Sequence, residues 1–210
     1  MNKTEKFWDR LSSNFDQESD DSAQTYNQTI EKTKKYLKVG DIVMDYGCAT
    51  GGTTLQIAGY VKEVHGVDIS SKMIAAAKRK AADRKIENLD FVKTTIFDER
   101  YQQGSFDVIL AFNILHLLED SQVVLQRINQ LLKPGGLRIS ETTCLREKAF
   151  LDRLIFVLLF LVTKMGIIPY VKFFSVAELE DSITKGGFQI VEAESMTNNP
   201  MSYFIVAKKV

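Results

Sequence analysis

Short apolar segments alternate with amphipathic segments along most of this chain. The apolar segments have the length and composition of buried strands, and they occupy residues 41–47, 63–70, 88–94, 105–114 and 136–144. The segments between them have helical periodicity, and they occupy residues 52–61, 71–85 and 119–133. Consecutive parallel strands need a crossover that covers the sheet, and a helix provides it. The alternation therefore predicts a doubly wound α/β fold built on a mostly parallel sheet.

The alternation stops near both ends of the chain. Residues 4–14 and 24–38 have the spacing of amphipathic helices. At the other end, a short helix over residues 175–186 precedes two expected strands, at 187–196 and 201–209. Only the tetrapeptide Thr-Asn-Asn-Pro joins these two strands, and strands joined by so short a link pair antiparallel. We therefore expect one domain with a seven-stranded sheet that ends in an antiparallel hairpin.

The charge and cysteine content exclude several kinds of protein. Lysine and arginine together number 27, as do aspartate and glutamate, so the formal net charge is zero. Nucleic-acid-binding proteins gain most of their affinity by neutralising phosphates, so a nucleic-acid partner is not expected. The two cysteines, Cys48 and Cys144, are too few for a disulfide framework or a metal site. Together with an N-terminus that is polar and acidic rather than signal-like, they favour a cytoplasmic protein without a bound metal.

A glycine-rich segment, DYGCATGG at residues 45–52, follows the first expected strand. Its glycines allow a sharp turn and let a ligand approach the backbone, and the helix that follows favours negative charge at its N-terminus. Asp68 ends the next expected strand, where an acidic residue accepts hydrogen bonds from the hydroxyls of a ribose. Alternatively, Asp68, Ser70 and Ser71 only cap the helix that begins near Lys72. The two features together predict a site for a nucleoside-containing cofactor.

Four motifs occur in order along the middle of the chain: VMDYGCATGGTT at residues 43–54, GVDIS at 66–70, SFDVILAFNILHLL at 105–118 and LLKPGG at 131–136. The series resembles that of class I S-adenosylmethionine-dependent methyltransferases, of the small-molecule or quinone-biosynthesis type. The resemblance is closest over residues 35–144 and extends through the final hairpin, because that family adds an antiparallel strand to its sheet. It implies a Rossmann-like methyltransferase fold, S-adenosyl-L-methionine as the cofactor and S-adenosyl-L-homocysteine as the product.

The resemblance also implies which residues bind the cofactor. The loop after the first strand would hold its methionine end, Asp68 its ribose, and Ile69 and Met73 its adenine ring. The complete implied set is Asp45, Tyr46, Gly47, Cys48, Ala49, Gly51, Asp68, Ile69, Met73, Thr95, Ile96, Phe97, Phe112 and Asn113. The family usually has an aspartate where this chain has Thr95, and Asp98 is the nearest alternative acid.

His116 is the candidate catalytic residue. It lies in AFNILHLLED, which follows the fourth strand and, by the resemblance, faces the methyl group of the cofactor. Methyl transfer is a direct displacement, so much of the catalysis is in-line positioning in a dry site. Imidazole titrates near neutrality, so His116 is a candidate general base or orienting group. The alternative is that it only packs beside the cofactor, and we expect the other histidine, His65, to be a core residue.

The most apolar stretch is RLIFVLLFLVTKMGIIPY, residues 153–170. A spanning helix needs about 20 predominantly apolar residues, and the uninterrupted run 154–162 is too short, so no transmembrane span is predicted. We expect the stretch to cover a pocket for an apolar acceptor. The candidate lining residues are Phe156, Phe160, Met165, Tyr170 and Phe173. A stabilising core helix, a homodimer contact and peripheral contact with a bilayer are the alternatives.

The resemblance and the apolar stretch together divide the domain into four parts. We expect an N-terminal helical lid over residues 1–38, a cofactor-binding core over 39–144, an apolar insertion over 145–175, and the last helix with its hairpin over 176–210. The predicted function is methylation of carbon, oxygen or nitrogen in a small, apolar molecule. The Asn-Pro-Pro-aromatic signature of methyltransferases that act on nucleic-acid or glutamine amines is absent from the sequence.

Two other functions fit part of the sequence. A non-catalytic module would use the same fold to hold a nucleoside or a partner, and a damaged cofactor loop would favour it. A nicotinamide-dependent oxidoreductase fits the relaxed glycine pattern of Gly47, Ala49 and Gly52, but the chain lacks a Tyr-x-x-x-Lys motif. Asp45, Gly47 and Asp68 are all in place, so the methyltransferase interpretation is favoured over both.

Overall fold

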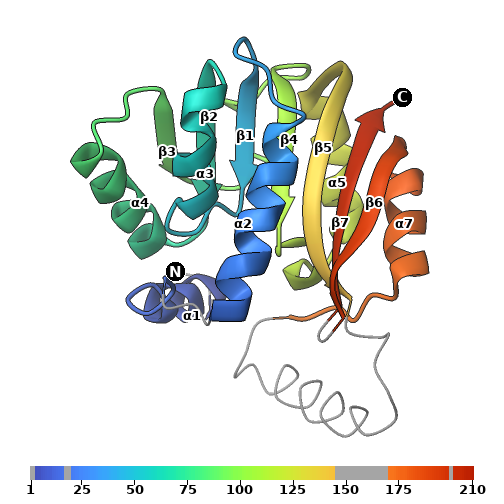
Figure 1. Ribbon diagram of the computed structural model, residues 1–210, viewed down its shortest axis with the longest axis horizontal. Coiled ribbons are helices and arrows are strands. Elements are labelled where there is room, and N and C mark those ends of the chain that lie inside the picture. Colours follow the sequence, from blue (N-terminus) through green and yellow to red (C-terminus); the bar gives the residue numbers. More distant parts are fainter. Residues whose placement is uncertain (1–2, 17–19, 145–169, 199–200) are drawn as a thin grey trace, which may run out of the picture.

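A single seven-stranded sheet organises the described part of the chain, which is residues 3–16, 20–144, 170–198 and 201–210 of a computed structural model (Figure 1). The strand order is β3-β2-β1-β4-β5-β7-β6. The strands are β1 Ile42–Tyr46, β2 Glu63–Asp68, β3 Leu89–Lys93, β4 Phe106–Phe112, β5 Leu132–Cys144, β6 Phe188–Asn198 and β7 Met201–Lys209. β1 to β5 pair in parallel, whereas β7 is antiparallel to β5 and β6. The predicted fold class and hairpin are confirmed.

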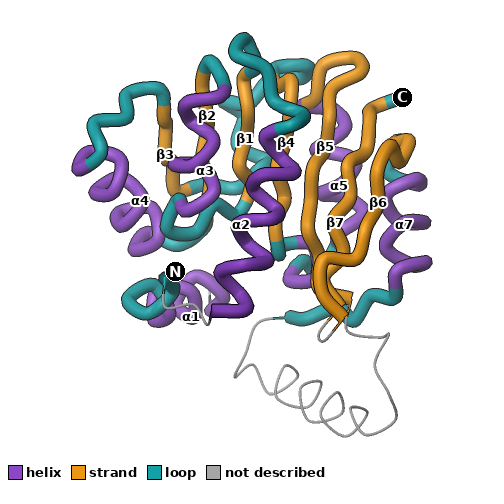
Figure 2. The backbone as a smooth tube through the Cα atoms, viewed as in Figure 1, coloured by secondary structure: helices purple, strands orange, loops and turns teal. Residues whose placement is uncertain are grey.

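Helices cover both faces of the sheet (Figures 1 and 2). They are α1 Lys3–Leu11, α2 Asp20–Lys34, α3 Gly52–Ile57, α4 Ser71–Asp83, α5 Ser121–Leu131 and α7 Val176–Lys185, with the 3-10 helices η1 Ala58–Tyr60 and η2 Leu115–Leu117. α2 and α3 lie on one face, and α5 and α7 lie on the other. α1 lies at the edge where the parallel strands end, next to the start of α4.

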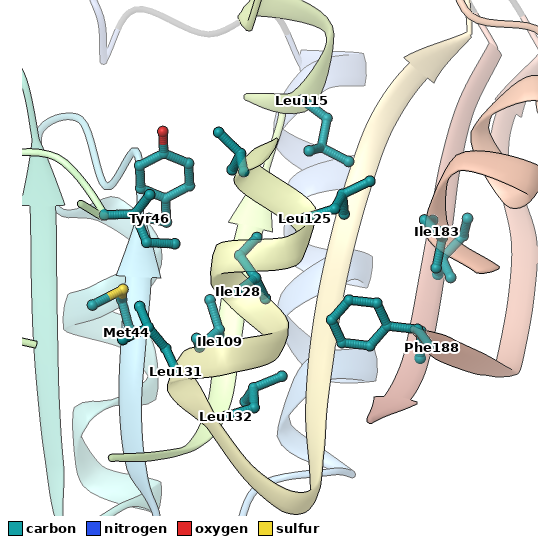
Figure 3. Packing of buried hydrophobic residues seen from close by; sticks show 14 of the residues in the cluster. Met44, Tyr46, Ile109, Leu115, Leu125, Ile128, Leu131, Leu132, Ile183 and Phe188 are labelled. Atoms are coloured by element: carbon teal, nitrogen blue, oxygen red, sulfur yellow. The ribbon is translucent and has the colours of Figure 1, made fainter. Parts of the chain in front are cut away.

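Alternate residues of the central strands supply two apolar layers. Met44 and Ile109 pack with Ile128 of α5 on one face (Figure 3). Their neighbours Val43 and Val108 pack on the opposite face. Because successive side chains of a strand point to opposite faces, a strand covered on both sides must be apolar at nearly every position. This explains why the central strands appear in the sequence as continuous apolar runs.

Several boundaries differ from the sequence prediction. The helices expected over residues 4–14 and 24–38 are α1 Lys3–Leu11 and α2 Asp20–Lys34, and two further differences concern the elements around the sheet. The helix expected over residues 52–61 is divided into α3 and the 3-10 helix η1, and β5 begins at Leu132 rather than at residue 136. The β4–β5 register shifts between Phe106 and Val108, which pair with Leu132 and Leu137. The segment LKPGG contains Pro134, which has no amide hydrogen, so it bulges from a ladder that resumes at Leu137.

His65 has the structural role expected of it. Its ring meets that of Phe106 edge-on, with ring centroids 5.4 Å apart, and its Nε2 lies 2.9 Å from Oε1 of Glu63. Both contacts lie within the sheet layer and away from the carboxyl edge, so His65 contributes to packing.

Candidate functional site

The loop after β1 turns sharply against the end of β2. Gly47 and Gly51 both have a φ of 79°, and Ala49 between them has a φ of 47°. The amides of Gly47 and Cys48 donate to the carbonyl of Val67, at 2.8 and 3.1 Å. Left-handed backbone at these positions favours glycine. The loop is therefore held close to β2 while its own backbone faces the carboxyl edge of the sheet.

Gly47 is the position where the loop has least room for a side chain. A Cβ there would lie 2.4 Å from Cδ1 of Ile114. We expect Gly47→Ala to destabilise the protein by about 2–4 kcal/mol, because it combines a left-handed alanine with overpacking. The matched control is Gly59→Ala, since no atom lies within 4 Å of a Cβ at that position. Urea unfolding of both variants is the measurement, and equal effects of the two substitutions would contradict the steric argument.

Asp68 ties the glycine loop to α4. Its Oδ2 accepts a hydrogen bond from the amide of Ala49 at 3.1 Å, and its Oδ1 accepts one from the amide of Ser70 at 2.7 Å. The cap of α4 is Ser70, whose Oγ accepts from the amide of Met73 at 3.1 Å. Burial raises the pKa of the Asp68 carboxyl. The carboxylate thus lies between the loop and α4, and the cap of α4 is Ser70 rather than Asp68.

Asp45 lies beneath the loop. It is 3% exposed, and its Oδ2 accepts a hydrogen bond from Oγ1 of Thr54 at 2.6 Å. Burial raises the pKa of this carboxyl to about 6. Its described contact is therefore with the first turns of α3, so Asp45 helps to set the position of the loop.

The raised pKa of Asp45 predicts a pH-dependent stability. The folded state binds this proton more tightly than the unfolded chain, whose pKa is near 3.8, so the site stabilises the fold least above pH 6. The shift corresponds to about 3 kcal/mol. Between pH 4 and pH 8 we therefore expect the stability of Asp45→Asn relative to the wild type to rise by about 2 kcal/mol, because the unfolded chain is already partly ionised at pH 4. Urea unfolding at the two pH values measures this, and a difference that is the same at both would contradict the assignment.

The residues predicted to surround the adenine differ in exposure. Met73 and Ile96 are buried, at 1% and 0% exposed, whereas Phe97 is 48% exposed at the sheet edge. Ile69 is half-buried and Thr95 is exposed. The buried apolar side chains of Met73 and Ile96 and the exposed ring of Phe97 therefore lie on the segments that follow β2 and β3.

Asp98, the alternative acid near Thr95, is already engaged locally. Its carboxylate accepts hydrogen bonds from Oγ1 of Thr94 at 2.6 Å and from the amide of Arg100 at 3.0 Å. The hydroxyl of Thr94 and the amide and side chain of Arg100 lower the pKa of this carboxyl to about 2. Asp98 is thus a charged group that shapes the turn after β3.

The end of β4 carries Asn113, whose φ is 50°. Its amide donates to the carbonyl of Glu141 at 2.7 Å, and its Oδ1 accepts from Oγ1 of Thr143 at 3.3 Å. Phe112, which precedes it, is half-buried. A polar pair from the tips of β4 and β5 therefore lies at the carboxyl edge, and the side chain of Ile114 reaches Gly47 of the loop.

His116 lies in η2, just beyond Asn113. Within the described part of the chain, its buried Nδ1 has no hydrogen-bond partner. Burial lowers the pKa of the imidazole to about 4. The ring is therefore neutral at pH 7 and can accept a proton. Its carbonyl accepts a hydrogen bond from the amide of Lys172 at 2.6 Å, which places residues 170–174 beside η2.

Sequence reasoning missed another buried acid near this edge, Glu141. It is 6% exposed at the carboxyl end of β5. Its carboxylate accepts hydrogen bonds from Thr29 of α2, at 2.5 Å, and from Ser202 of β7. Glu141 thus joins α2 to the sheet next to Asn113. The available signal was an acid within the apolar pattern of GLRISETTC, which is weak without a known partner.

The N-terminal segment contacts the glycine loop and α4 through two acids. Oδ1 of Asp9 accepts a hydrogen bond from Oγ of Ser70 at 2.6 Å, and Oδ1 of Asp16 accepts one from Oγ1 of Thr50 at 2.6 Å. Asp16 also forms an ion pair with Lys80 at 2.7 Å. The hydrogen bond from Ser70 lowers the pKa of Asp9. Residues next to Asp68 and within the loop are therefore bonded to this segment.

The prediction for residues 153–169 lies outside the described residues, and Tyr170 and Phe173 are half-buried. No helix in the described ranges is long and apolar enough to cross a membrane.

A parallel sheet with a glycine loop after β1, an acid at the end of β2 and a reversed last strand defines a nucleoside-cofactor-binding α/β protein. A family model described as a methyltransferase domain matches residues 37–165. The chain belongs to this methyltransferase family, as the motif series predicted.

Three known proteins illustrate the relationship. Ubiquinone biosynthesis O-methyltransferase of Nitrosococcus oceani is 30% identical over 168 residues, which cover 78% of this chain and 70% of that protein. Phosphoethanolamine N-methyltransferase 2 of Caenorhabditis elegans is 28% identical over 114 residues, which cover 53% of this chain and only 26% of that protein. The structure of the Haemonchus contortus phosphoethanolamine N-methyltransferase 2 with phosphomonomethylethanolamine and S-adenosylhomocysteine has a TM-score of 0.72 and 20% identity, covering 88% of this chain and 53% of that one. The last comparison concerns the fold alone.

Proposed function

We propose that this chain transfers a methyl group from S-adenosyl-L-methionine to a small, apolar acceptor. The observation that carries the proposal is the Asp68 carboxylate, bonded to Ala49 of the loop and to Ser70 of α4. Beside it, Gly47 and Gly51 adopt left-handed backbone. An acid that can accept from ribose hydroxyls and a loop backbone that a ligand can approach closely lie at one edge of the sheet. The family of the chain supports the same activity over a binding module or an oxidoreductase.

The bound cofactor would supply an electrophilic methyl group on a sulfonium. The chain would hold that group through the loop backbone and Asp68, with Asn113 near the acceptor. As the acceptor atom takes the methyl group, it loses a proton, and in this proposal the neutral imidazole of His116 would receive it. We retain the whole predicted set of cofactor-binding residues as part of this proposal.

The neighbours of His116 support an apolar acceptor. The hydrogen bond from Lys172 to the His116 carbonyl brings Tyr170, Phe173 and Phe174 beside η2. Phe174 is buried, and Tyr170 and Phe173 are half-buried. The relatives are named for ubiquinone biosynthesis and for phosphoethanolamine methylation, which concern unlike molecules. We therefore infer the apolar character of the acceptor from the side chains near His116 and not from the relatives. An apolar ring or chain would pack against them.

The remaining predictions about cellular context belong to the same proposal. Cys48 and Cys144 are buried and form no disulfide in the described part of the chain, which suits a cytoplasmic protein. α1 and the loop to Asp16 would act as the lid, because their acids bond to Ser70 and Thr50. α2 carries Thr29, which bonds to the sheet through Glu141, so it would form the fixed side of this lid. Peripheral contact with a bilayer and a homodimer stay proposals, to be tested by liposome co-sedimentation and light scattering.

Calorimetry with S-adenosyl-L-methionine tests the cofactor, and isotope labelling tests the acceptor. We expect saturable binding of the cofactor at micromolar concentration. Cell extract incubated with the protein and methyl-labelled cofactor should then yield a labelled small molecule that partitions into organic solvent. A protein that shows no binding at high micromolar concentration would refute the activity, whereas a water-soluble labelled product would refute only the apolar acceptor.

A further inference from the structure

Three polar side chains on β5 have no part in the proposed methyl transfer. Arg138, Ser140 and Thr142 alternate along the strand, so they point to the same face of the sheet. Arg138 pairs across the sheet with Ile109 and Ala207, which belong to the apolar layer under α5 and α7. All three side chains are 0% exposed. They form a polar row inside the layer that Figure 3 shows around α5.

None of the polar atoms of this row has a hydrogen-bond partner among the described residues. The unpartnered atoms are Nε and both Nη atoms of Arg138, Oγ of Ser140 and Oγ1 of Thr142. Buried polar groups in native proteins are almost always paired, and an unpaired buried charge is the most costly case. Burial lowers the pKa of Arg138 to about 9, so the guanidinium still carries its charge at pH 7. The row therefore needs a negative partner.

The residues that flank this row in the sheet supply no such partner. Ile109 and Ala207 flank Arg138 in the β4–β5 and β5–β7 registers, and Ala111 and Ile205 flank Ser140. Tyr203, which pairs with Thr142 in the β5–β7 register, donates its hydroxyl to Glu180 of α7 at 2.7 Å. No ion pair links Arg138 to a carboxylate in the described part of the chain. One buried cation with two buried hydroxyl groups on the same face of the strand suits a single small anion.

We propose that Arg138, Ser140 and Thr142 form an internal binding site for a small monovalent anion of the size of chloride. One negative charge neutralises one guanidinium, whereas a divalent anion would leave a net charge buried. The two hydroxyl groups complete the donor set on the strand side. The site is separate from the cofactor edge and does not depend on the proposed methyl transfer. It holds the middle of β5, whose carboxyl end carries Glu141 and Thr143.

Thermal unfolding in sodium chloride and in sodium gluconate, at equal ionic strength, tests this site. A ligand that binds only the folded state raises the unfolding temperature, and we expect a rise of about 3 °C or more in chloride for the wild type. Arg138→Met should lose this dependence on chloride. The matched control is Arg79→Met on the exposed surface of α4, which should respond to chloride as the wild type does.

Equal unfolding temperatures of the wild type in the two salts would overturn the proposal. So would a response to chloride that Arg138→Met retains in full. If Arg138→Met does not fold, crystals of the wild type soaked in bromide decide the question. An anomalous peak within hydrogen-bond distance of the Arg138 guanidinium supports the site, whereas water alone at that position overturns it.

Discussion

Replacement of Asp68 by alanine should reduce the affinity for S-adenosyl-L-methionine by at least about 100-fold, or about 2.7 kcal/mol. The carboxylate is the one group at the end of β2 that can accept from two ribose hydroxyls, and hydrogen bonds to a charged group contribute about 1.5–3 kcal/mol each. The same side chain holds the amides of Ala49 and Ser70. Its loss therefore removes both a ligand contact and the hydrogen bonds that order the loop. Titration calorimetry on the purified variant measures the change in affinity.

Two further variants separate the charge of Asp68 from its shape. Asp68→Asn keeps an oxygen acceptor without the charge, and we expect an affinity between those of the wild type and the alanine variant. Asp90→Ala on the neighbouring strand removes an acid whose side chain is 56% exposed, and it should leave the affinity unchanged. Binding by a folded Asp68→Ala variant within threefold of the wild type would show that another group holds the ribose.

Most of the fold was predictable because each element has its own local periodicity. The buried strands β1 and β4 are apolar at nearly every position, and α4 has a clear apolar face made by Met73, Ile74 and Ala77. The start of β5 was not predictable in the same way. LKPGG has the composition of a turn, and only the pairing of Leu132 with Phe106 makes it the first part of a strand. Such pairing depends on residues that are distant in the sequence, so local periodicity cannot predict it.

In the candidate site, too, the sequence predicts the residues of local motifs but not those whose contacts are distant in the chain. Gly47 and Gly51 lie in one short loop after β1 and Asp68 ends β2, so local motifs predict them as candidate site residues. Asp9 and Glu141 were missed because their partners are distant in sequence. Asp9 bonds to a residue 61 positions away, and Glu141 bonds to one 112 positions away. An acid that caps a remote helix or joins two layers looks in the sequence like any other charged residue.

His116→Ala should lower kcat by about 100-fold or more while the affinity for the cofactor stays within threefold. General-base catalysis contributes about 10²–10⁴-fold, and the residue touches the reaction only through its imidazole. Burial lowers the pKa of that imidazole to about 4. The ring is thus in its proton-accepting form at every pH above about 4, and it loses that form as the pH falls through this value. We therefore expect kcat to be constant between pH 6 and pH 8. A catalytic histidine with an ordinary pKa near 6.5 would instead cause kcat to fall as the pH is lowered from 8 to 6.

A glutamine variant distinguishes a base from a residue that only packs. His116→Gln fills a similar volume without a titrating ring, so a packing role predicts that it restores turnover, and a base predicts that it does not. Single-turnover rates with methyl-labelled cofactor and the acceptor found by labelling measure this without a contribution from product release. A His116→Ala rate within tenfold of the wild type, about 1.4 kcal/mol, would remove His116 from the proton transfer. The polar pair of Asn113 and Thr143, at the ends of β4 and β5, would then be the next groups to test.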